Sequence, residues 1–172
     1  SKVVAVGKNY PDHAAEMGTA TPSEPLLFIK PSTAVTAAGA PVYYPNQSAQ
    51  IDYEGELAVV IGDRCAHVPP DEARAKIWGY TIANDITARD LQKRDGQWTR
   101  AKGFDTFCPL GPWIVRELSA EARLQTFLND QETPVQSASV DEMTFSPDYL
   151  VAYISVAIEG IGMLENSVAL RP

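Results

Sequence analysis

The segment from Ile51 to Ile61 constrains the fold of this chain more than any other feature. Its first half alternates in character, reading Ile51-Asp52-Tyr53-Glu54-Gly55-Glu56, and its second half, from Leu57 to Ile61, is apolar throughout. Alternation with a period of two is typical of a strand with one polar face, whereas an unbroken apolar run of this length indicates burial. We therefore predict one long strand whose acidic end lies at the boundary of the core.

Several shorter elements are predicted around this strand. Short apolar runs bounded by turn residues indicate strands at 3–6, 26–29 and 80–86, and the Pro-interrupted segment 107–115 suggests a loop and an edge strand. Helix starts are predicted at Pro11, at Pro70 with a helix running through Ile77, at Thr87, which with Asp90 resembles a capping box, and at Ser146-Pro147-Asp148. The outline is that of a strand-rich α+β domain without regular βαβ alternation.

Composition bounds the class of protein. With 172 residues, 45% of them hydrophobic, the chain can form one domain with a substantial core. The net charge of −8 argues against nucleic acid and anionic membranes as partners, and no apolar run approaches the roughly 18–20 residues that span a bilayer. No secretory signal is visible, and Cys65 and Cys108 lack metal-site spacing, so we expect a cytoplasmic protein. Because Ser1 opens directly into an apolar run, we also expect that an N-terminal segment precedes it.

Three carboxylates are the first candidate site residues. Glu54 and Glu56 stand two apart on the predicted strand, so they leave the same face and repel each other unless water or a cation intervenes. Asp85 stands among apolar or weakly polar neighbours and also requires a partner. A solvated strand face and a helix cap are the plain alternatives. Three carboxylates without a soft ligand point instead to Mg²⁺ or Mn²⁺, with coordination positions left for a chelating 2-oxo acid and water.

His13 and Glu16 form a second candidate group. They are three residues apart and are therefore neighbours on one face of the short predicted helix. An incidental surface pair is the commoner case. The functional alternative is a histidine base, oriented by a carboxylate, that deprotonates water.

Four further polar side chains are candidates to bind a substrate. Arg89 and Gln92 share a helix face directly after Asp85, where the helix start itself favours an anion. Lys102 could be a surface lysine or the cation that neutralises a substrate carboxylate, and Lys30 is a weaker candidate of the same kind. No dinucleotide, P-loop or α/β-hydrolase motif is found in the sequence.

These residues fall within a set of motifs that resembles the fumarylacetoacetate hydrolase superfamily. Gly7-Lys8-Asn9-Tyr10 with Asp12-His13 resembles its G-x-N-Y-x-x-H signature, and 25–32 is similar to its P-x-x-F-x-K-P-[ST] segment. Residues 52–62 look like its metal-binding strand, and 84–92 and 102–105 complete the set in the expected order. The match runs from Val3 to about Ser155, and as an ordered set it is highly specific.

The resemblance implies a mixed β-roll or β-sandwich fold of the C-terminal-domain type, in one catalytic domain over 1–172, and a homodimer. It implies Mg²⁺ or Mn²⁺ on Glu54, Glu56 and Asp85, with His13 and Glu16 on a lid helix that activates water. Lys102, Arg89 and Gln92 would contact the substrate. One departure stands out: Val156-Ala157 runs straight into Ile158-Glu159-Gly160-Ile161-Gly162, where the family has a further strand and a T-G-T-P-x-G-V-G loop. We expect that residues near 157–158 are omitted from this sequence rather than deleted from the protein.

The implied chemistry is the stabilisation of an enolate of a small 2-oxo or 2-hydroxy diacid. Hydrolysis of an acylpyruvate and decarboxylation of oxaloacetate both release such an enolate by breaking a C–C bond. The alternative within enzymes is an isomerase of 2-hydroxymuconate-type diacids in aromatic-acid catabolism. The alternative of another class is a non-catalytic domain that binds only a metal or a diacid, which a true deletion of the loop would favour.

Overall fold

The computed structural model describes residues 2–11, 20–119 and 121–157. Its strands are β1 (Val3–Gly7), β2 (Leu26–Lys30), β3 (Val35–Ala37), β4 (Ile51–Asp52), β5 (Gly55–Ile61), β6 (Ile77–Asn84), β7 (Thr87–Ala88), β8 (Cys108–Val115), β9 (Arg123–Thr126) and β10 (Gln136–Ser139). Its helices are α2 (Pro70–Ala73), α3 (Arg89–Asp95), α4 (Trp98–Lys102) and α5 (Pro147–Ala157), with 3-10 turns at Ser32–Ala34, Arg74–Lys76 and Val140–Glu142. The predicted strands at 3–6 and 26–29 and the predicted helix start at Pro147 are confirmed.

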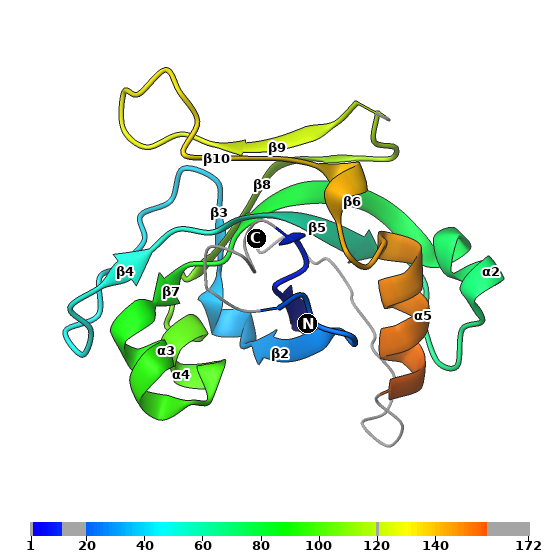
Figure 1. Ribbon diagram of the computed structural model, residues 1–172, viewed down its shortest axis with the longest axis horizontal. Helices are drawn as coiled ribbons and strands as arrows, with labels where there is room; N and C mark the ends of the chain where they lie inside the picture. The colour runs from blue at the N-terminus through cyan, green and yellow to red at the C-terminus, as the bar shows by residue number, and fades with distance from the viewer. Residues whose placement is uncertain (1, 12–19, 120, 158–172) are drawn as a thin grey trace, which may run out of the picture.

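The largest sheet has four strands in the order β3-β8-β6-β5. Strands β3 and β8 are parallel, whereas β8 with β6 and β6 with β5 are antiparallel, so the sheet is mixed. Three two-stranded antiparallel pairs, β1–β2, β4–β7 and β9–β10, surround it. Figure 1 shows the β1–β2 pair below the arch of β5 and β6, the β9–β10 hairpin along the other side, and α3–α4 and α5 at opposite ends. The predicted strand-rich α+β class is confirmed.

The strand predicted as continuous from 51 to 61 is interrupted. Ile51 and Asp52 pair with β7, whereas β5 begins only at Gly55 and pairs with β6. Between them, the Glu54 amide N donates to Asn84 Oδ1 at 3.0 Å, a side chain rather than a neighbouring strand. The chain changes partner at Glu54, and this change separates the acidic segment from the apolar strand.

The two ends of β6 also differ from prediction. Strand β6 starts at Ile77 and ends at Asn84, so Asp85 lies just beyond its end and not within it. The helix predicted through Ile77 is one α-helical turn to Ala73 and a 3-10 turn to Lys76, because Ile77 is drawn into the sheet opposite Ile61.

The predicted capping box at Thr87 is wrong. Helix α3 is preceded by Ala88, with no side-chain cap, and Thr87 belongs to β7. The Asp90 carboxylate instead accepts hydrogen bonds from Ser48 Oγ at 2.5 Å and from the Ala49 amide N at 3.0 Å. The Thr87 hydroxyl is thereby left for the candidate site.

Segment 107–115 is a strand as predicted, but it does not lie at an edge. Strand β8 lies between β3 and β6 despite Pro109 and Pro112, which lack an amide hydrogen. Its pairing with β6 shifts register between Tyr80 and Ile82, so the ladder is irregular where the prolines occur.

Two apolar clusters form the core. Leu91 and Phe107 are completely buried in the first, which joins α3 and α4 to β8, and Tyr80 lies in the second, which α5 covers with Val151 and Ala152. Each fully buried side chain of the size of leucine contributes about 1.5–3 kcal/mol by leaving water. Helix α3 ends at Gly96, whose φ of 68° is a left-handed conformation that glycine adopts without strain.

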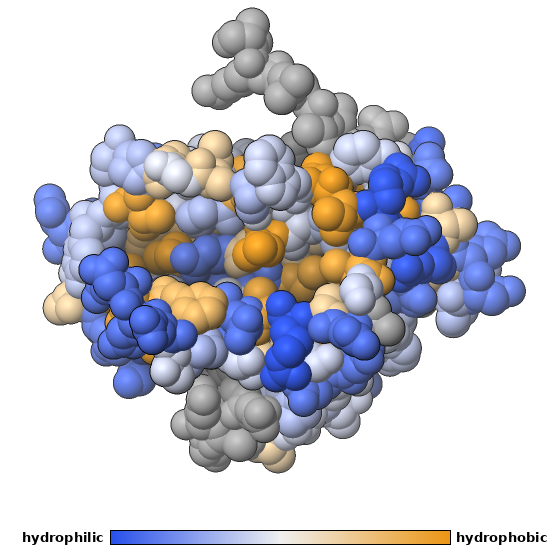
Figure 2. Space-filling model, turned by 90° about the horizontal axis from the view of Figure 1, so that it is seen from above, coloured by the Kyte–Doolittle hydropathy of each residue, from blue (hydrophilic) through white to orange (hydrophobic). Residues whose placement is uncertain are grey.

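Apolar side chains also remain on the surface. Figure 2 shows apolar groups along the middle of the face seen from above, between hydrophilic regions. Trp113 and Tyr43 are the most exposed large apolar residues of the described chain, at 76% and 65%. Within the described ranges, no helix has the length and apolarity required to cross a membrane.

Candidate active site

The register of β5 and β6 brings Glu54 and Asp85 together. Gly55 pairs with Asn84, so the residues just outside each strand are opposite one another. The Asp85 amide N donates to the Glu54 carbonyl O at 2.8 Å, which extends the ladder by one bond. Both side chains are buried, with 8% of Glu54 and 7% of Asp85 exposed. Two carboxylates from separate strands therefore share one desolvated region.

Lys102 joins these two carboxylates. Its Nζ lies 2.8 Å from Glu54 Oε2, 2.6 Å from Asp85 Oδ2 and 2.8 Å from Thr87 Oγ1, and only 2% of the residue is exposed. An ammonium has three hydrogens to donate, so all of its donors are used. Because the Thr87 hydroxyl donates its own hydrogen to the Asp85 carbonyl at 2.9 Å, it can only accept from Lys102. Thr87 therefore fixes the position of the ammonium.

Arg89 holds the other oxygen of Glu54. Its Nη2 lies 2.5 Å from Glu54 Oε1, its Nε lies 2.8 Å from Asp52 Oδ2, and its Nη1 donates to Gln92 Oε1 at 2.7 Å. Burial alone would raise the pKa of Glu54, but the charges and hydrogen bonds of Lys102 and Arg89 outweigh it and hold that pKa below its usual range. Glu54 is therefore ionised at neutral pH.

Lys30 lies behind the site and does not line it. Its Nζ lies 2.5 Å from Asp85 Oδ1 and 3.4 Å from the Ile86 carbonyl O, and 1% of the residue is exposed. Burial lowers the pKa of Lys30, while the adjacent Asp85 charge acts in the opposite direction. Lys30 was predicted to bind substrate, but its contacts are those of a residue that orients Asp85.

Glu56 differs from the other two carboxylates. Burial, followed by the charges of Glu54 and Asp85, raises its pKa to about 8, although Lys102 acts in the opposite direction. Within the described residues, no ion pair to Glu56 is found. Among the described residues, the buried Tyr10 hydroxyl has no hydrogen-bond partner, and burial followed by the charge of Glu56 raises its pKa. After burial, the charges of Glu54 and Asp85 therefore outweigh that of Lys102 in their effect on the pKa of Glu56.

Gln136 is a site residue that the sequence did not reveal. From β10, its Oε1 accepts from the Gly55 amide N at 3.0 Å and its Nε2 donates to the Gly55 carbonyl O at 2.8 Å. These two bonds fix the residue between Glu54 and Glu56. A Cβ on Gly55 would lie 2.4 Å from Thr126 Oγ1 and 3.1 Å from Gln136 Oε1, so the close approach of the hairpin requires glycine.

The charged groups surround a small cavity of about 20 Å³. It is lined by Val6, Gly7, Lys8, Glu54, Glu56, Asp85, Arg89, Gln92, Trp98 and Lys102. A cavity of this size holds about one water molecule or one ion. The structure thus brings together six of the predicted site residues: Glu54, Glu56, Asp85, Arg89, Gln92 and Lys102. His13 and Glu16, like the junction at 157–158, lie outside the described residues.

The side chains that line the cavity include the ligands of a hard divalent cation. Carboxylate oxygens are the ligands that Mg²⁺ and Mn²⁺ prefer, and three such groups line the cavity. Burial and the charges of Glu54 and Asp85 raise the pKa of Glu56, and Lys102 offsets them only in part. As they stand, no three His, Cys, Asp or Glu side chains of the described chain are grouped as a metal site, and the Lys102 ammonium bridges Glu54 and Asp85. The chemistry fits a hard cation, provided that Lys102 gives up these oxygens.

Fold and site together define a strand-rich α+β domain that buries a carboxylate–lysine–arginine cluster, an arrangement suited to a small anionic ligand. The sequence matches the family described as "Fumarylacetoacetate (FAA) hydrolase C-terminal" over residues 2–159, and the chain belongs to this family.

Named relatives include several kinds of enzyme. The chain is 41% identical to 2,4-didehydro-3-deoxy-L-rhamnonate hydrolase of a Sphingomonas species, over 90% of this chain and 55% of that protein. It is 40% identical to a human mitochondrial oxaloacetate tautomerase, over 90% of this chain and 50% of that protein. The crystal structure of 5-carboxymethyl-2-hydroxymuconate delta-isomerase from Mycobacterium smegmatis has 45% identity and a TM-score of 0.82, covering 95% of this chain and 63% of that one. The chain therefore spans between half and two thirds of the length of these proteins.

Proposed function

We propose that this chain is a divalent-cation-dependent enzyme that acts on small 2-oxo acids through an enolate, hydrolysing or decarboxylating a C–C bond. One observation carries the proposal: three carboxylates from two separate strand ends line a single small cavity, and Glu56 among them forms no ion pair within the described residues. Membership of a family that contains hydrolases supports an enzymatic role.

Glu54, Glu56 and Asp85 are the residues that would hold Mg²⁺ or Mn²⁺. When bound, such a cation supplies Lewis acidity to the oxygen on which negative charge develops. The protein contributes the rest. Lys30 and Gln136 hold Asp85 and the Gly55 backbone in place, so the carboxylates need little rearrangement to bind.

Lys102 and Arg89 are proposed to bind the substrate. In the cation-free protein, Lys102 directs all three donors to Glu54, Asp85 and Thr87. If Glu54 and Asp85 held a cation, they would accept less from Lys102, and its ammonium would have donors free for a substrate carboxylate. Arg89 and Gln92, which already share a hydrogen bond at the cavity wall, would orient the same anion. His13, with Glu16, remains the proposed base for water activation.

Isomerisation or tautomerisation is a second candidate function. A specific observation favours it: relatives at 45% and 40% identity are named as an isomerase and a tautomerase. Both reactions move a proton and need no attacking water, so neither would require His13 to activate water. The candidate functions are thus separated by their need for water activation.

Activity assays test the proposal directly. The purified protein is to be incubated with oxaloacetate, an acylpyruvate and a 2-hydroxymuconate analogue, each with Mn²⁺, with Mg²⁺ and with EDTA. We expect turnover of at least one substrate that EDTA abolishes and that Glu56→Gln lowers by orders of magnitude, while Glu132→Gln, on an exposed loop, has no effect. Cation binding without turnover of any substrate would contradict the enzymatic proposal and favour a binding domain.

One substitution at each of the two histidines separates hydrolysis from proton transfer. His13→Ala is expected to abolish acylpyruvate hydrolysis, whereas His67→Ala is expected to leave it unchanged because His67 is exposed and does not line the cavity. Full hydrolysis by His13→Ala would refute the water-activation role. Loss of hydrolysis with retained tautomerisation would identify two activities of one site.

A further inference from the structure

Two charged residues that line the cavity, one acidic and one basic, take part in no ion pair within the described residues. Ion pairs connect three bases, Lys30, Arg89 and Lys102, with three acids, Asp52, Glu54 and Asp85. Among the charged groups that line the cavity, this leaves Glu56 and Lys8. No hydrogen bond or ion pair of the Lys8 side chain is found within the described residues, although the residue is partly buried.

The backbone of Lys8 is held in an uncommon conformation. Its φ of 58° is left-handed, which non-glycine residues seldom adopt. On one side, Gly7 packs so tightly that an added Cβ would lie 2.7 Å from the Trp98 ring. Such outliers persist only where the surrounding structure holds them, and they concentrate at functional sites.

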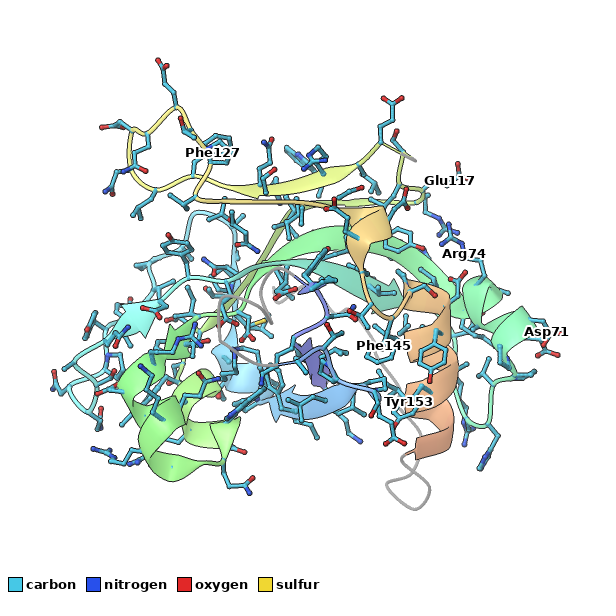
Figure 3. The ribbon with its side chains drawn as sticks, viewed as in Figure 1. Asp71, Arg74, Glu117, Phe127, Phe145 and Tyr153 are labelled. Carbon is cyan, nitrogen blue, oxygen red and sulfur yellow. The ribbon has the colours of Figure 1, made fainter. Side chains whose placement is uncertain are left out.

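Asn9 supplies the restraint on the other side. Its Nδ2 donates to the Phe145 carbonyl O at 3.0 Å, its Oδ1 accepts from the Phe145 amide N at 2.9 Å, and its own carbonyl accepts from the Thr144 amide N at 2.7 Å. Figure 3 shows Phe145 in the loop that leads into α5, beside the N-terminal strands. The Lys8 backbone is therefore fixed between two anchors, and the residue lines the cavity.

We infer that Lys8 is a specificity-determining residue that binds the second carboxylate of a 2-oxo dicarboxylate. The inference rests on the proposed function, in which the 2-oxo acid end of the substrate binds at the carboxylate cluster. With the three ion pairs neutral, a divalent cation, Glu56 as an anion and Lys8 as a cation leave a net charge of two positive units. A monocarboxylate neutralises one unit, and only a dicarboxylate neutralises both.

A matched pair of ligands isolates this contact. 2-Oxoglutarate and 2-oxopentanoate have the same five-carbon chain and the same 2-oxo acid end, and they differ in the distal carboxylate alone. Isothermal titration calorimetry in the presence of Mn²⁺ measures the affinity of each for the wild-type chain, Lys8→Met, Lys8→Arg and the control Lys93→Met, which removes an exposed lysine on α3.

Lys8→Met is expected to weaken 2-oxoglutarate about tenfold, equivalent to about 1.4 kcal/mol, and to change 2-oxopentanoate less than about twofold. Lys8→Arg is expected to retain most of the preference, and Lys93→Met all of it. Equal weakening of both ligands by Lys8→Met, or weakening of neither, would overturn the assignment of Lys8 and leave the proposed function intact. Failure of the wild-type chain to bind either ligand with Mn²⁺ would refute the proposed function, and the assignment of Lys8 with it.

Discussion

Replacing Glu56 by glutamine changes how the stability of the cation-free protein depends on pH. The pKa of Glu56 is about 8 in the folded chain, against 4.5 for an ordinary glutamate. Between these two values the unfolded chain loses the proton while the folded chain retains it. The unfolded state then binds fewer protons than the folded state, so the free energy of unfolding decreases as pH rises from about 4.5 to about 8 and is constant on either side.

The magnitude follows from the two pKa values. Each pH unit over which only the unfolded state is ionised lowers the free energy of unfolding by about 1.4 kcal/mol. The interval from 4.5 to about 8 therefore corresponds to a loss of about 5 kcal/mol as an upper bound. Glutamine has nearly the same shape and does not ionise, so this loss is absent from Glu56→Gln. The lowered pKa of Glu54 acts below pH 4.5 and does not overlap this range.

Urea unfolding in EDTA, at pH 5 and at pH 8, measures the effect. We expect the wild-type chain to lose several kcal/mol between the two values, the Glu56→Gln variant to lose much less, and the exposed control Glu132→Gln to behave as wild type. Mn²⁺ is expected to restore the stability of the wild-type chain at pH 8 and to have a much smaller effect on Glu56→Gln. Equal pH dependence of the wild-type chain and Glu56→Gln in EDTA would refute the electrostatic reasoning.

Three further substitutions test the packing of the same site. Lys102→Met removes the ammonium that Glu54 and Asp85 share, so we expect the free energy of unfolding to fall by about 3–5 kcal/mol and turnover to be abolished. Retained turnover would contradict the role of the ammonium. Thr87→Val removes the hydroxyl that accepts from Lys102 and donates to the Asp85 carbonyl, so we expect urea unfolding to show a free energy of unfolding lower by about 1–3 kcal/mol. An unchanged free energy of unfolding would show that the hydroxyl is dispensable. Gly55→Ala places a Cβ 2.4 Å from Thr126 Oγ1, so we expect a loss of about 1–3 kcal/mol that Thr126→Ala partly relieves, and an additive double variant would argue against this clash.

The acidic residues of the candidate site could be predicted from local sequence, because each is an acid next to apolar or weakly polar neighbours. Glu54 and Glu56 alternate on one face before an apolar run, and Asp85 is an acid among weakly polar neighbours. The exact element boundaries could not be predicted in the same way. The Asn84 side chain, thirty residues away, accepts from the Glu54 amide, and no local pattern announces such a bond.

Long-range contacts also explain why the partners of other residues could not be predicted. Gln136 has ordinary neighbours in sequence, and its importance arises only where the β9–β10 hairpin meets Gly55. The position of Lys30 between an apolar strand and Pro31 makes it a weak candidate for a substrate contact, and the fold shows that its ammonium contacts Asp85. Thr87 had the spacing of a helix cap, yet the buried ammonium of Lys102 is its partner. A sequence pattern shows which residue needs a partner, and only the fold supplies it.

Anomalous diffraction from crystals of this chain soaked in Mn²⁺ tests the central claim most directly. One Mn²⁺ peak is expected in the cavity, at a coordination distance of roughly 2–2.5 Å from oxygens of Glu54, Glu56 and Asp85, with Lys102 Nζ displaced from at least one of the two carboxylates it now bridges. A cavity without a peak at saturating Mn²⁺, or an ion bound elsewhere while Lys102 keeps both contacts, would contradict the account.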